Sequence, residues 1–211
     1  MTLHGSPLDV SPVIPVVVID DPAAAVPLAR ALVAGGVGVI EVTLRTPQAL
    51  DAVAAIAAGV PEIALGVGSV LTPAQADVAI ERGAEFLVSP GAGPALLQHL
   101  GQVPVPVLPG TATVSEMLAA MEVGLSELKF FPAGPAGGPS YLKAVSAPVP
   151  GVRFCPTGGV TPANLTDYLA LPNVAAVGGT WLTPASLVEA GEWSKITDLA
   201  AEAVATAGGG R

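Results

Sequence analysis

The chain has 211 residues, a formal net charge of −9 and 51% hydrophobic residues, whereas charged residues make up only 12%. This length and apolar content predict one domain with a large core, and the negative charge argues against a nucleic-acid surface. The apolar residues come in short runs broken by Gly and Pro, and none approaches the roughly 18 residues of a membrane helix. We therefore expect neither a nucleic-acid partner nor a membrane association.

The first seven residues show neither the basic start nor the apolar core of a secretory signal. Cys155 is the only cysteine, which excludes an internal disulfide and fits a reducing compartment. Both features predict a cytoplasmic protein. Residues 1–12 are interpreted as a short lead-in, either poorly ordered or folded as a cover, and residues 208–211 as a frayed tail.

Eight stretches rich in Val, Ile, Leu or Phe are predicted to be strands. They cover residues 13–19, 37–44, 63–70, 86–91, 105–111, 127–133, 152–158 and 174–180. Five of them are followed by a capping side chain and a proline, a pair that typically opens a helix. These pairs are Asp21-Pro22, Thr46-Pro47, Thr72-Pro73, Thr161-Pro162 and Thr183-Pro184. The order along the chain is therefore strand, then helix, repeated.

The segment after the first strand has apolar residues at helical spacing and ends at Gly35-Gly36, with Pro27 expected to kink it. The next two helical segments end at Gly59 and Gly83, and residues from Pro184 to about 207 are interpreted as an eighth helix and its approach. Eight units of roughly 25 residues fill the chain, which predicts an α/β fold, a single-domain (β/α)8 (TIM) barrel over residues 1–211. A doubly wound open sheet is the alternative, but no Gly-x-Gly-x-x-Gly motif follows the first strand.

Lys129 lies inside an apolar strand, between Leu128 and Phe130, near the strand's carboxyl end. In a barrel, catalytic residues gather at that end. A buried ammonium is costly, and its neutral amine can attack a carbonyl group to form a Schiff base. The alternative is that Lys129 reaches solvent or pairs with a neighbouring acid.

Glu41 and Arg45 lie four residues apart at the end of the second predicted strand. A carboxylate with apolar neighbours takes up a proton more readily, as a general acid/base requires. The guanidinium fork of Arg45 is suited to a carboxylate or a phosphate. The alternative is a structural ion pair between the two residues.

Small residues end the remaining strands, where they would let a ligand approach the backbone. The third, fourth and fifth strands end at Gly68-Ser69, Pro90-Gly91 and Gly110-Thr111. The seventh and eighth end in glycine pairs, Gly158-Gly159 and Gly178-Gly179, at the position where barrel enzymes hold phosphate with backbone N–H groups.

Five segments together resemble the class I 2-keto-3-deoxy-6-phosphogluconate (KDPG) aldolases, including the bifunctional 2-keto-4-hydroxyglutarate aldolases. They are residues 41–45, 89–91, 127–133, 153–160 and 178–181. The resemblance extends from about residue 12 to the C-terminal helix. It implies that Lys129 forms the Schiff base, that Glu41 is the acid/base and that Arg45 binds the pyruvate carboxylate.

The resemblance also assigns the rest of the pocket. Its implied phosphate ligands are Gly158, Gly159 and Thr180, with Gly179 beside them, and its implied pocket-lining residues are Ser69, Pro90, Phe131 and Thr157. Ser69 replaces the family's usual threonine and Thr180 its usual serine, so the hydroxyl groups are kept. The expected partners are a 2-keto acid and a phosphorylated aldehyde, and the expected assembly is a homotrimer.

The expected reaction is cleavage of KDPG to pyruvate and glyceraldehyde 3-phosphate, with 4-hydroxy-2-ketoglutarate as a second substrate. It needs no cofactor, and the two histidines, His4 and His99, lie too far apart in sequence to suggest a metal-ligand cluster. Three alternatives are an aldolase for the galactonate epimer, a phosphosugar isomerase on the same barrel, and a non-catalytic binder of phosphorylated sugar acids. A non-catalytic binder would gain nothing from a lysine buried in an apolar strand.

Overall fold

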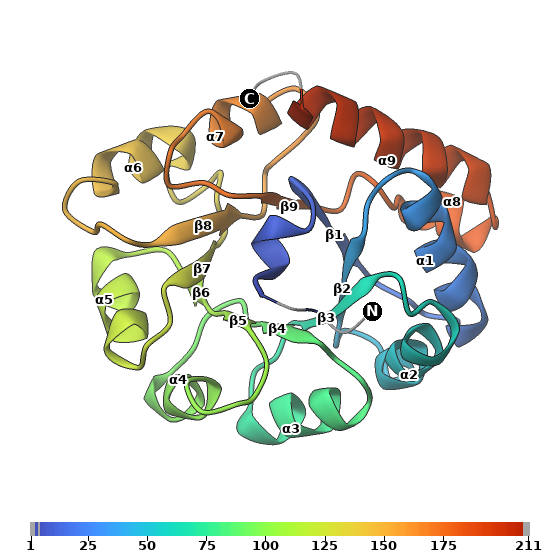
Figure 1. The fold of residues 1–211 in the computed structure, drawn as a ribbon, viewed down its shortest axis with the longest axis horizontal. Coiled ribbons are helices and arrows are strands. Elements are labelled where there is room, and N and C mark those ends of the chain that lie inside the picture. The colour runs from blue at the N-terminus through green and yellow to red at the C-terminus, as the bar shows by residue number, and fades with distance from the viewer. Residues whose placement is uncertain (1–2, 4, 209–211) are drawn as a thin grey trace.

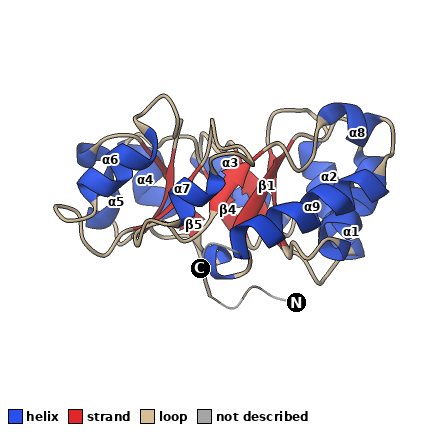
Figure 2. Cartoon of the chain, turned by 90° about the horizontal axis from the view of Figure 1, so that it is seen from above, coloured by secondary structure: helices blue, strands red, loops and turns tan. Residues whose placement is uncertain are grey.

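The computed structural model describes residue 3 and residues 5–208. Parallel strands occupy the middle of the molecule and helices lie outside them (Figures 1 and 2). The strands are β1 (Val13–Val17), β2 (Val39–Thr43), β3 (Ala64–Gly68), β4 (Phe86–Val88), β5 (Val107–Leu108), β6 (Gly110–Thr111), β7 (Glu127–Phe130), β8 (Arg153–Pro156) and β9 (Val177–Gly179). The helices are α1 (Ala25–Ala34), α2 (Ala49–Gly59), α3 (Pro73–Glu81), α4 (Pro94–Leu100), α5 (Val114–Glu122), α6 (Gly138–Val145), α7 (Leu165–Leu169), α8 (Ala185–Glu189) and α9 (Trp193–Gly208). Two short 3-10 helices, η1 (Pro7–Asp9) and η2 (Pro22–Ala24), precede α1.

Each predicted strand contains an observed strand, and the expected stretch 105–111 contains two, β5 and β6, separated by Pro109. Every pairing is parallel, in a six-stranded sheet of order β5-β4-β3-β2-β1-β9 and a three-stranded sheet of order β6-β7-β8. The α/β class with a parallel sheet is therefore confirmed. The tail expected to fray lies outside the described residues beyond Gly208, which ends α9.

The strands are buried on both faces, as parallel strands covered by helices should be. In β7, Phe130 packs outward against α6, where its ring stacks on Tyr141 at a centroid distance of 5.4 Å. Because side chains alternate along a strand, Glu127 and Lys129 face the opposite way, toward the side of the strands away from α6. The register pairs Glu127 with Arg153 and Lys129 with Cys155 on β8. The apolar residues around Lys129 thus direct it inward.

Two of the expected helix starts are confirmed. The Asp21 carboxylate accepts a hydrogen bond from the N–H of Ala23 at the start of η2. Thr72 caps α3 in a capping box with Gln75. Pro27 was expected to kink the first helix, but it lies in the first turn of α1, where backbone N–H groups have no intrahelical acceptor.

The expected caps at Thr46, Thr161 and Thr183 are wrong. The Thr46 hydroxyl donates to the Ile19 carbonyl (2.6 Å), so it joins two strand ends instead of capping α2. Helix α7 begins only after Asn164, whose side-chain oxygen accepts the Thr161 N–H (2.8 Å). The buried Thr183 hydroxyl has no hydrogen-bond partner among the described residues, and α8 begins after the following proline. At Thr46 a tertiary contact thus replaces local capping.

The lead-in forms a cover over the amino ends of β7 and β8. Its blue turn crosses the centre of the molecule in Figure 1. The Ser6 hydroxyl donates to Glu127 (2.5 Å), and Arg153 forms ion pairs with both Asp9 and Glu127. Leu8 is buried in the core. Of the two interpretations of the lead-in, the described residues support the folded one. Among them, no helix combines the length and apolar character needed to cross a bilayer.

Candidate active site

Lys129 and Glu41 form a buried pair although they come from strands far apart in the chain. Each residue is only 3% exposed. The Lys129 Nζ donates a hydrogen bond to the Glu41 Oε1 at 3.2 Å. The expected alternative of an ion pair between Glu41 and Arg45 is therefore wrong, because among the described residues the lysine is the ion-pair partner of Glu41. Two polar groups of opposite charge are held together in an interior that otherwise disfavours both.

The Glu41 carboxylate fits because β3 carries glycine where it approaches. The register pairs Glu41 with Gly66, and a Cβ atom added to Gly68 would lie only 2.0 Å from the Glu41 Oε1. A Cβ on Gly66 would meet the Phe86 ring at 2.1 Å. The two glycines of β3 thus leave space for an aromatic ring and a carboxylate inside the sheet.

Arg45 lies beyond the end of β2, where its Nε donates to the Ser69 hydroxyl at 3.1 Å. Ser69 has a φ of 58°, a left-handed conformation that is uncommon outside glycine. Arg45 forms no ion pair with a described residue, so the rest of its guanidinium fork faces the cavity. This arrangement places a cation at the same cavity as Lys129, with donors left for an anionic ligand.

A cavity of about 240 Å³ opens at the carboxyl ends of the strands. Eight of the eleven predicted site residues line it: Arg45, Lys129, Phe131, Thr157, Gly158, Gly159, Gly179 and Thr180. Glu41 and Ser69 reach it through their hydrogen bonds to Lys129 and Arg45. Pro90 is not among the lining residues. Its carbonyl oxygen instead lies 2.2 Å from where a Cβ of Gly110 would be, and Gly110 is the register partner of Lys129.

The glycine pairs form the other end of this cavity. Gly158 and Gly159 have φ values of 89° and 85°, which favour glycine, and the Gly159 carbonyl accepts a hydrogen bond from Asn164 (3.0 Å). A Cβ on Gly179 would overlap the Trp181 ring. No lysine or arginine lines this end, so an anion there would meet backbone N–H groups and the Thr180 hydroxyl.

Three further residues of the site were missed from the sequence. Val16 on β1 and Val160 after β8 line the cavity, but isolated valines carry no chemical signal. Cys155 is the register partner of Lys129, and burial, reinforced by the Glu41 charge, raises the pKa of its thiol to about 12. Only the tertiary structure shows that these three residues belong to the site.

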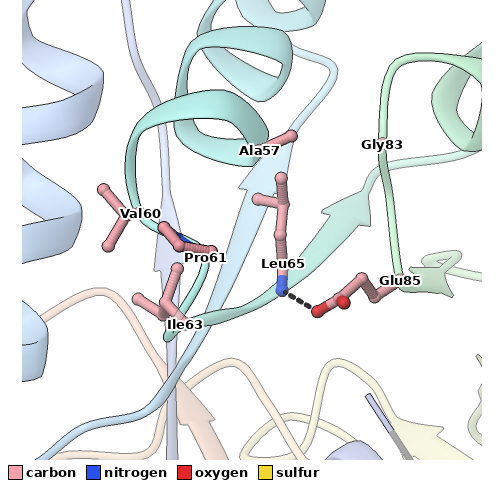
Figure 3. A pocket seen from close by; sticks show the side chains of 7 residues that line it. All are labelled: Ala57, Val60, Pro61, Ile63, Leu65, Gly83 and Glu85. Atoms are coloured by element: carbon pink, nitrogen blue, oxygen red, sulfur yellow. Dashed lines mark hydrogen bonds between the residues drawn. The ribbon is translucent and has the colours of Figure 1, made fainter. Parts of the chain in front are cut away.

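A second hollow, of about 210 Å³, lies at the amino ends of β3 and β4 and contains none of the predicted site residues (Figure 3). Its one acid, Glu85, accepts hydrogen bonds from the N–H groups of Leu65 (3.3 Å) and Leu3 (3.0 Å). This carboxylate is therefore used to anchor backbone. Among the described residues, no cluster of three or more His, Cys, Asp or Glu side chains is arranged to hold a metal ion.

A buried lysine bonded to a carboxylate, beneath a cavity at the carboxyl ends of parallel strands, is the arrangement of enzymes that bind carbonyl substrates through a lysine. Comparison with known proteins gives the particular family. The family described as "Aldolase: KDPG and KHG aldolase" matches residues 6–199. The chain belongs to this family.

Relatives cover almost the whole chain. The KHG/KDPG aldolase of Escherichia coli (strain K12) is 52% identical over 203 residues, which cover 96% of this chain and 95% of that protein. The 2-dehydro-3-deoxy-phosphogluconate aldolase of Pseudoalteromonas atlantica is 47% identical, covering 94% and 92%. One solved structure is the KDPG aldolase from Legionella pneumophila, with pyruvate captured at low pH as a covalent carbinolamine intermediate. It superposes on this chain with a TM-score of 0.90 at 45% sequence identity. The match covers 92% of this chain and 94% of that one.

Proposed function

We propose that this protein is a Schiff-base (class I) aldolase, a carbon–carbon lyase that cleaves KDPG to pyruvate and glyceraldehyde 3-phosphate. The proposal includes 4-hydroxy-2-ketoglutarate, which would give pyruvate and glyoxylate. The observation that carries it is the hydrogen bond of 3.2 Å between the buried Lys129 Nζ and Glu41 Oε1, below a cavity open at the carboxyl ends of the strands. The covalent pyruvate named for the Legionella relative supports the same chemistry.

In the proposed mechanism, the neutral Lys129 amine adds to the C2 carbonyl of the substrate, and loss of water with uptake of one proton from solvent, which hydrolysis of the imine later gives back, leaves a protonated imine. Glu41 accepts the proton of the C4 hydroxyl as the C3–C4 bond breaks, and the electron pair of that bond moves into the imine. The aldehyde leaves. Glu41 then returns its proton to C3 of the enamine, and water hydrolyses the imine to release pyruvate and the free lysine.

The remaining predicted residues bind and orient the substrate. Arg45, held by Ser69, binds the C1 carboxylate. Phe131 and Thr157 line the wall between the two ends of the cavity. Gly158, Gly159, Gly179 and Thr180 bind the phosphate. Pro90 supports the site indirectly, because it packs closely against Gly110 on β6, the residue that pairs with Lys129 on β7.

We also propose that the strands close into one (β/α)8 barrel that forms a single domain. Three observations support closure. β5 and β6 are separated by one residue, β1 pairs with both β2 and β9, and isolated bridges join Phe154 to Val174 and Thr157 to Gly178. Counting β5 and β6 as one interrupted strand gives the expected eight.

A homotrimer in the cytoplasm completes the proposal. An exposed apolar stripe on α5, made of Val114, Leu118 and Met121, repeats at helical spacing and provides a surface that another subunit could cover. The single, buried Cys155 fits a reducing compartment. Light scattering after gel filtration measures the trimer directly.

Assays of retro-aldol cleavage test the function. The purified protein is incubated with KDPG, with its galactonate epimer and with 4-hydroxy-2-ketoglutarate, and pyruvate is measured with a coupled dehydrogenase. Release of pyruvate from KDPG with the largest kcat/KM supports the proposal. Preference for the epimer would favour the alternative aldolase, and absence of pyruvate from all three would favour the non-catalytic binder.

A further inference from the structure

The cavity has one wall that the proposed mechanism does not use. Val16, on β1, is the residue of that strand that lines the cavity, and it is 3% exposed. Its register partner on β2 is Glu41, and its neighbour Pro15 pairs with Gly179 on β9. Val16 therefore lies between the strand that carries the acid/base and the strand that carries the expected phosphate site.

The cavity is also lined by residues of β7 and β8 and by those that follow them, among them Lys129, Phe131 and Thr157. A substrate that reaches from Lys129 to Gly179-Thr180 takes its passage through the cavity that Val16 lines. The valine has no hydrogen-bonding group, and its branched side chain has a stiff χ1 torsion. It can restrict this passage by shape but cannot recognise a hydroxyl group.

We propose that Val16 is a specificity-determining residue, which sets the width of the passage between the imine end and the phosphate end of the cavity. This inference rests on the proposed function. The pyruvate part of every substrate is held on the Lys129 side and does not enter the passage. The part released as aldehyde does enter it, so substrates that carry a long phosphorylated tail depend on Val16 more than short ones.

The two substrates differ in the size of the part that is released as an aldehyde. KDPG carries three carbons and a phosphate beyond the bond that breaks, whereas 4-hydroxy-2-ketoglutarate carries only two carbons, one of them a carboxylate. A larger side chain at position 16 should obstruct the first class and spare the second. A smaller one should widen the range of tails accepted. One methylene in a well-packed pocket changes discrimination by about 10–200-fold.

The experiment compares Val16→Leu, Val16→Ala and Val16→Thr in the full-length protein. Thr is the shape-matched comparison, since it keeps the branched shape of valine and exchanges one methyl group for a hydroxyl group. For each variant, kcat/KM is measured with KDPG and with 4-hydroxy-2-ketoglutarate, and the rate of covalent trapping is measured with pyruvate and cyanoborohydride. Circular dichroism and thermal unfolding confirm that each variant is folded.

Val16→Leu is expected to lower kcat/KM for KDPG by about tenfold or more, while pyruvate trapping stays within about twofold of the parent. Val16→Thr, which keeps the branched shape, should lower kcat/KM for KDPG less than Val16→Leu does, and Val16→Ala should shift the ratio of the two substrates opposite to Val16→Leu. Two results overturn the inference: an equal fall of KDPG cleavage and pyruvate trapping in folded Val16→Leu, or unchanged KDPG cleavage in both Val16→Leu and Val16→Ala.

The two proposals fail in different ways. If the parent protein traps no pyruvate and cleaves no substrate, the aldolase proposal fails, and the inference about Val16 falls with it. If the parent is active but the substitutions leave KDPG cleavage unchanged relative to trapping, only the role of Val16 is lost. If the parent does not cleave 4-hydroxy-2-ketoglutarate, the comparison of KDPG cleavage with pyruvate trapping still tests the role of Val16.

Discussion

The Lys129 Nζ and the Glu41 Oε1 lie 3.2 Å apart, inside the protein, although 88 residues separate them along the chain. The pair joins β7 to β2 across the interior. Each side chain is only 4% exposed, so each depends mainly on the other or on a bound substrate for its polar contact. This relationship places the proposed nucleophile and the proposed acid/base close enough to act on neighbouring atoms of one substrate.

Borohydride reduction in the presence of pyruvate should attach the ligand covalently at Lys129. Lys129→Arg should form no adduct and show no turnover, because guanidinium remains protonated and cannot add to a carbonyl. Peptide mapping by mass spectrometry locates the adduct, and Lys143→Arg on α6 is the matched control. An adduct on Lys143 or Lys195 in the parent protein would contradict the proposed mechanism.

Glu41→Gln keeps the shape of the side chain and removes its ability to shuttle protons. We expect turnover of KDPG to fall by about 10²–10⁴-fold, the usual contribution of a general acid/base. Imine trapping at Lys129 should remain detectable, because attack on the ketone does not require the C4 proton to move. Turnover within about threefold of the parent would show that Glu41 has a structural role.

Gly68→Ala should displace the Glu41 carboxylate, because the added Cβ would lie 2.0 Å from its Oε1. We expect a loss of about 10²-fold in kcat, typical of a misplaced reacting group. Exchange of the pyruvate methyl protons with deuterated water, followed by NMR, should slow in parallel, since it requires protonation at the enamine carbon. Gly93→Ala is the control, as its Cβ would meet nothing within 4 Å. Normal exchange in folded Gly68→Ala would exclude this positioning role.

The burial of Lys129 could be predicted because Leu128 and Phe130 make the strand apolar on its outer side, and alternation then directs the lysine inward. The glycine pairs were likewise recognisable from their place at strand ends. The partner of Glu41 was not, because Arg45 is near in sequence while Lys129 becomes near only through the arrangement of the strands. Local spacing favoured the wrong ion pair.

The helix caps and the apolar residues that line the cavity likewise depend on contacts between residues far apart in the sequence. Thr46 has the sequence of a helix cap, yet its hydroxyl bonds to Ile19, which lies far away in the chain. Val16 and Cys155 look like ordinary strand residues in the sequence, and only the register brings them beside Glu41 and Lys129. Local chemistry identified the polar residues of the site, whereas their apolar surroundings required the tertiary structure.

Cys155 makes stability depend on pH above neutrality. Burial raises the pKa of its thiol from 9.0 to about 12, so the folded state keeps a proton that the unfolded state releases. The stabilisation is fully present below pH 9.0 and is lost as the pH rises toward 12. The free energy of unfolding in urea should fall over this window, by at most about 1.4 kcal/mol per pH unit for one proton. Cys155→Ala should reduce this slope, and equal slopes in the two proteins would contradict the prediction.

At the expected phosphate end of the cavity, formed by Gly158, Gly159, Gly179 and Thr180, the lining residues include no basic side chain. An anion there would be bound by backbone N–H groups and the Thr180 hydroxyl. Thr180→Val keeps the size of the side chain and removes the hydroxyl, so it should weaken phosphorylated substrates by roughly 1–3 kcal/mol, the scale of a lost hydrogen bond to a charged group. Gly159→Val should do the same and also strain the backbone, since residue 159 has a φ of 85°.

Pyruvate trapping at Lys129 should be nearly unchanged in both variants, and cleavage of unphosphorylated 4-hydroxy-2-ketoglutarate should survive better than cleavage of KDPG. The quantity to measure is the ratio of kcat/KM for these two substrates, with trapping as the control for an intact imine site. Thr180→Val is the cleaner of the two variants, because Thr180 is exposed and its replacement strains no backbone. If the ratio is unchanged in folded Thr180→Val and Gly159→Val, the phosphate must be bound elsewhere, because the two groups best placed to hold it would both have been altered.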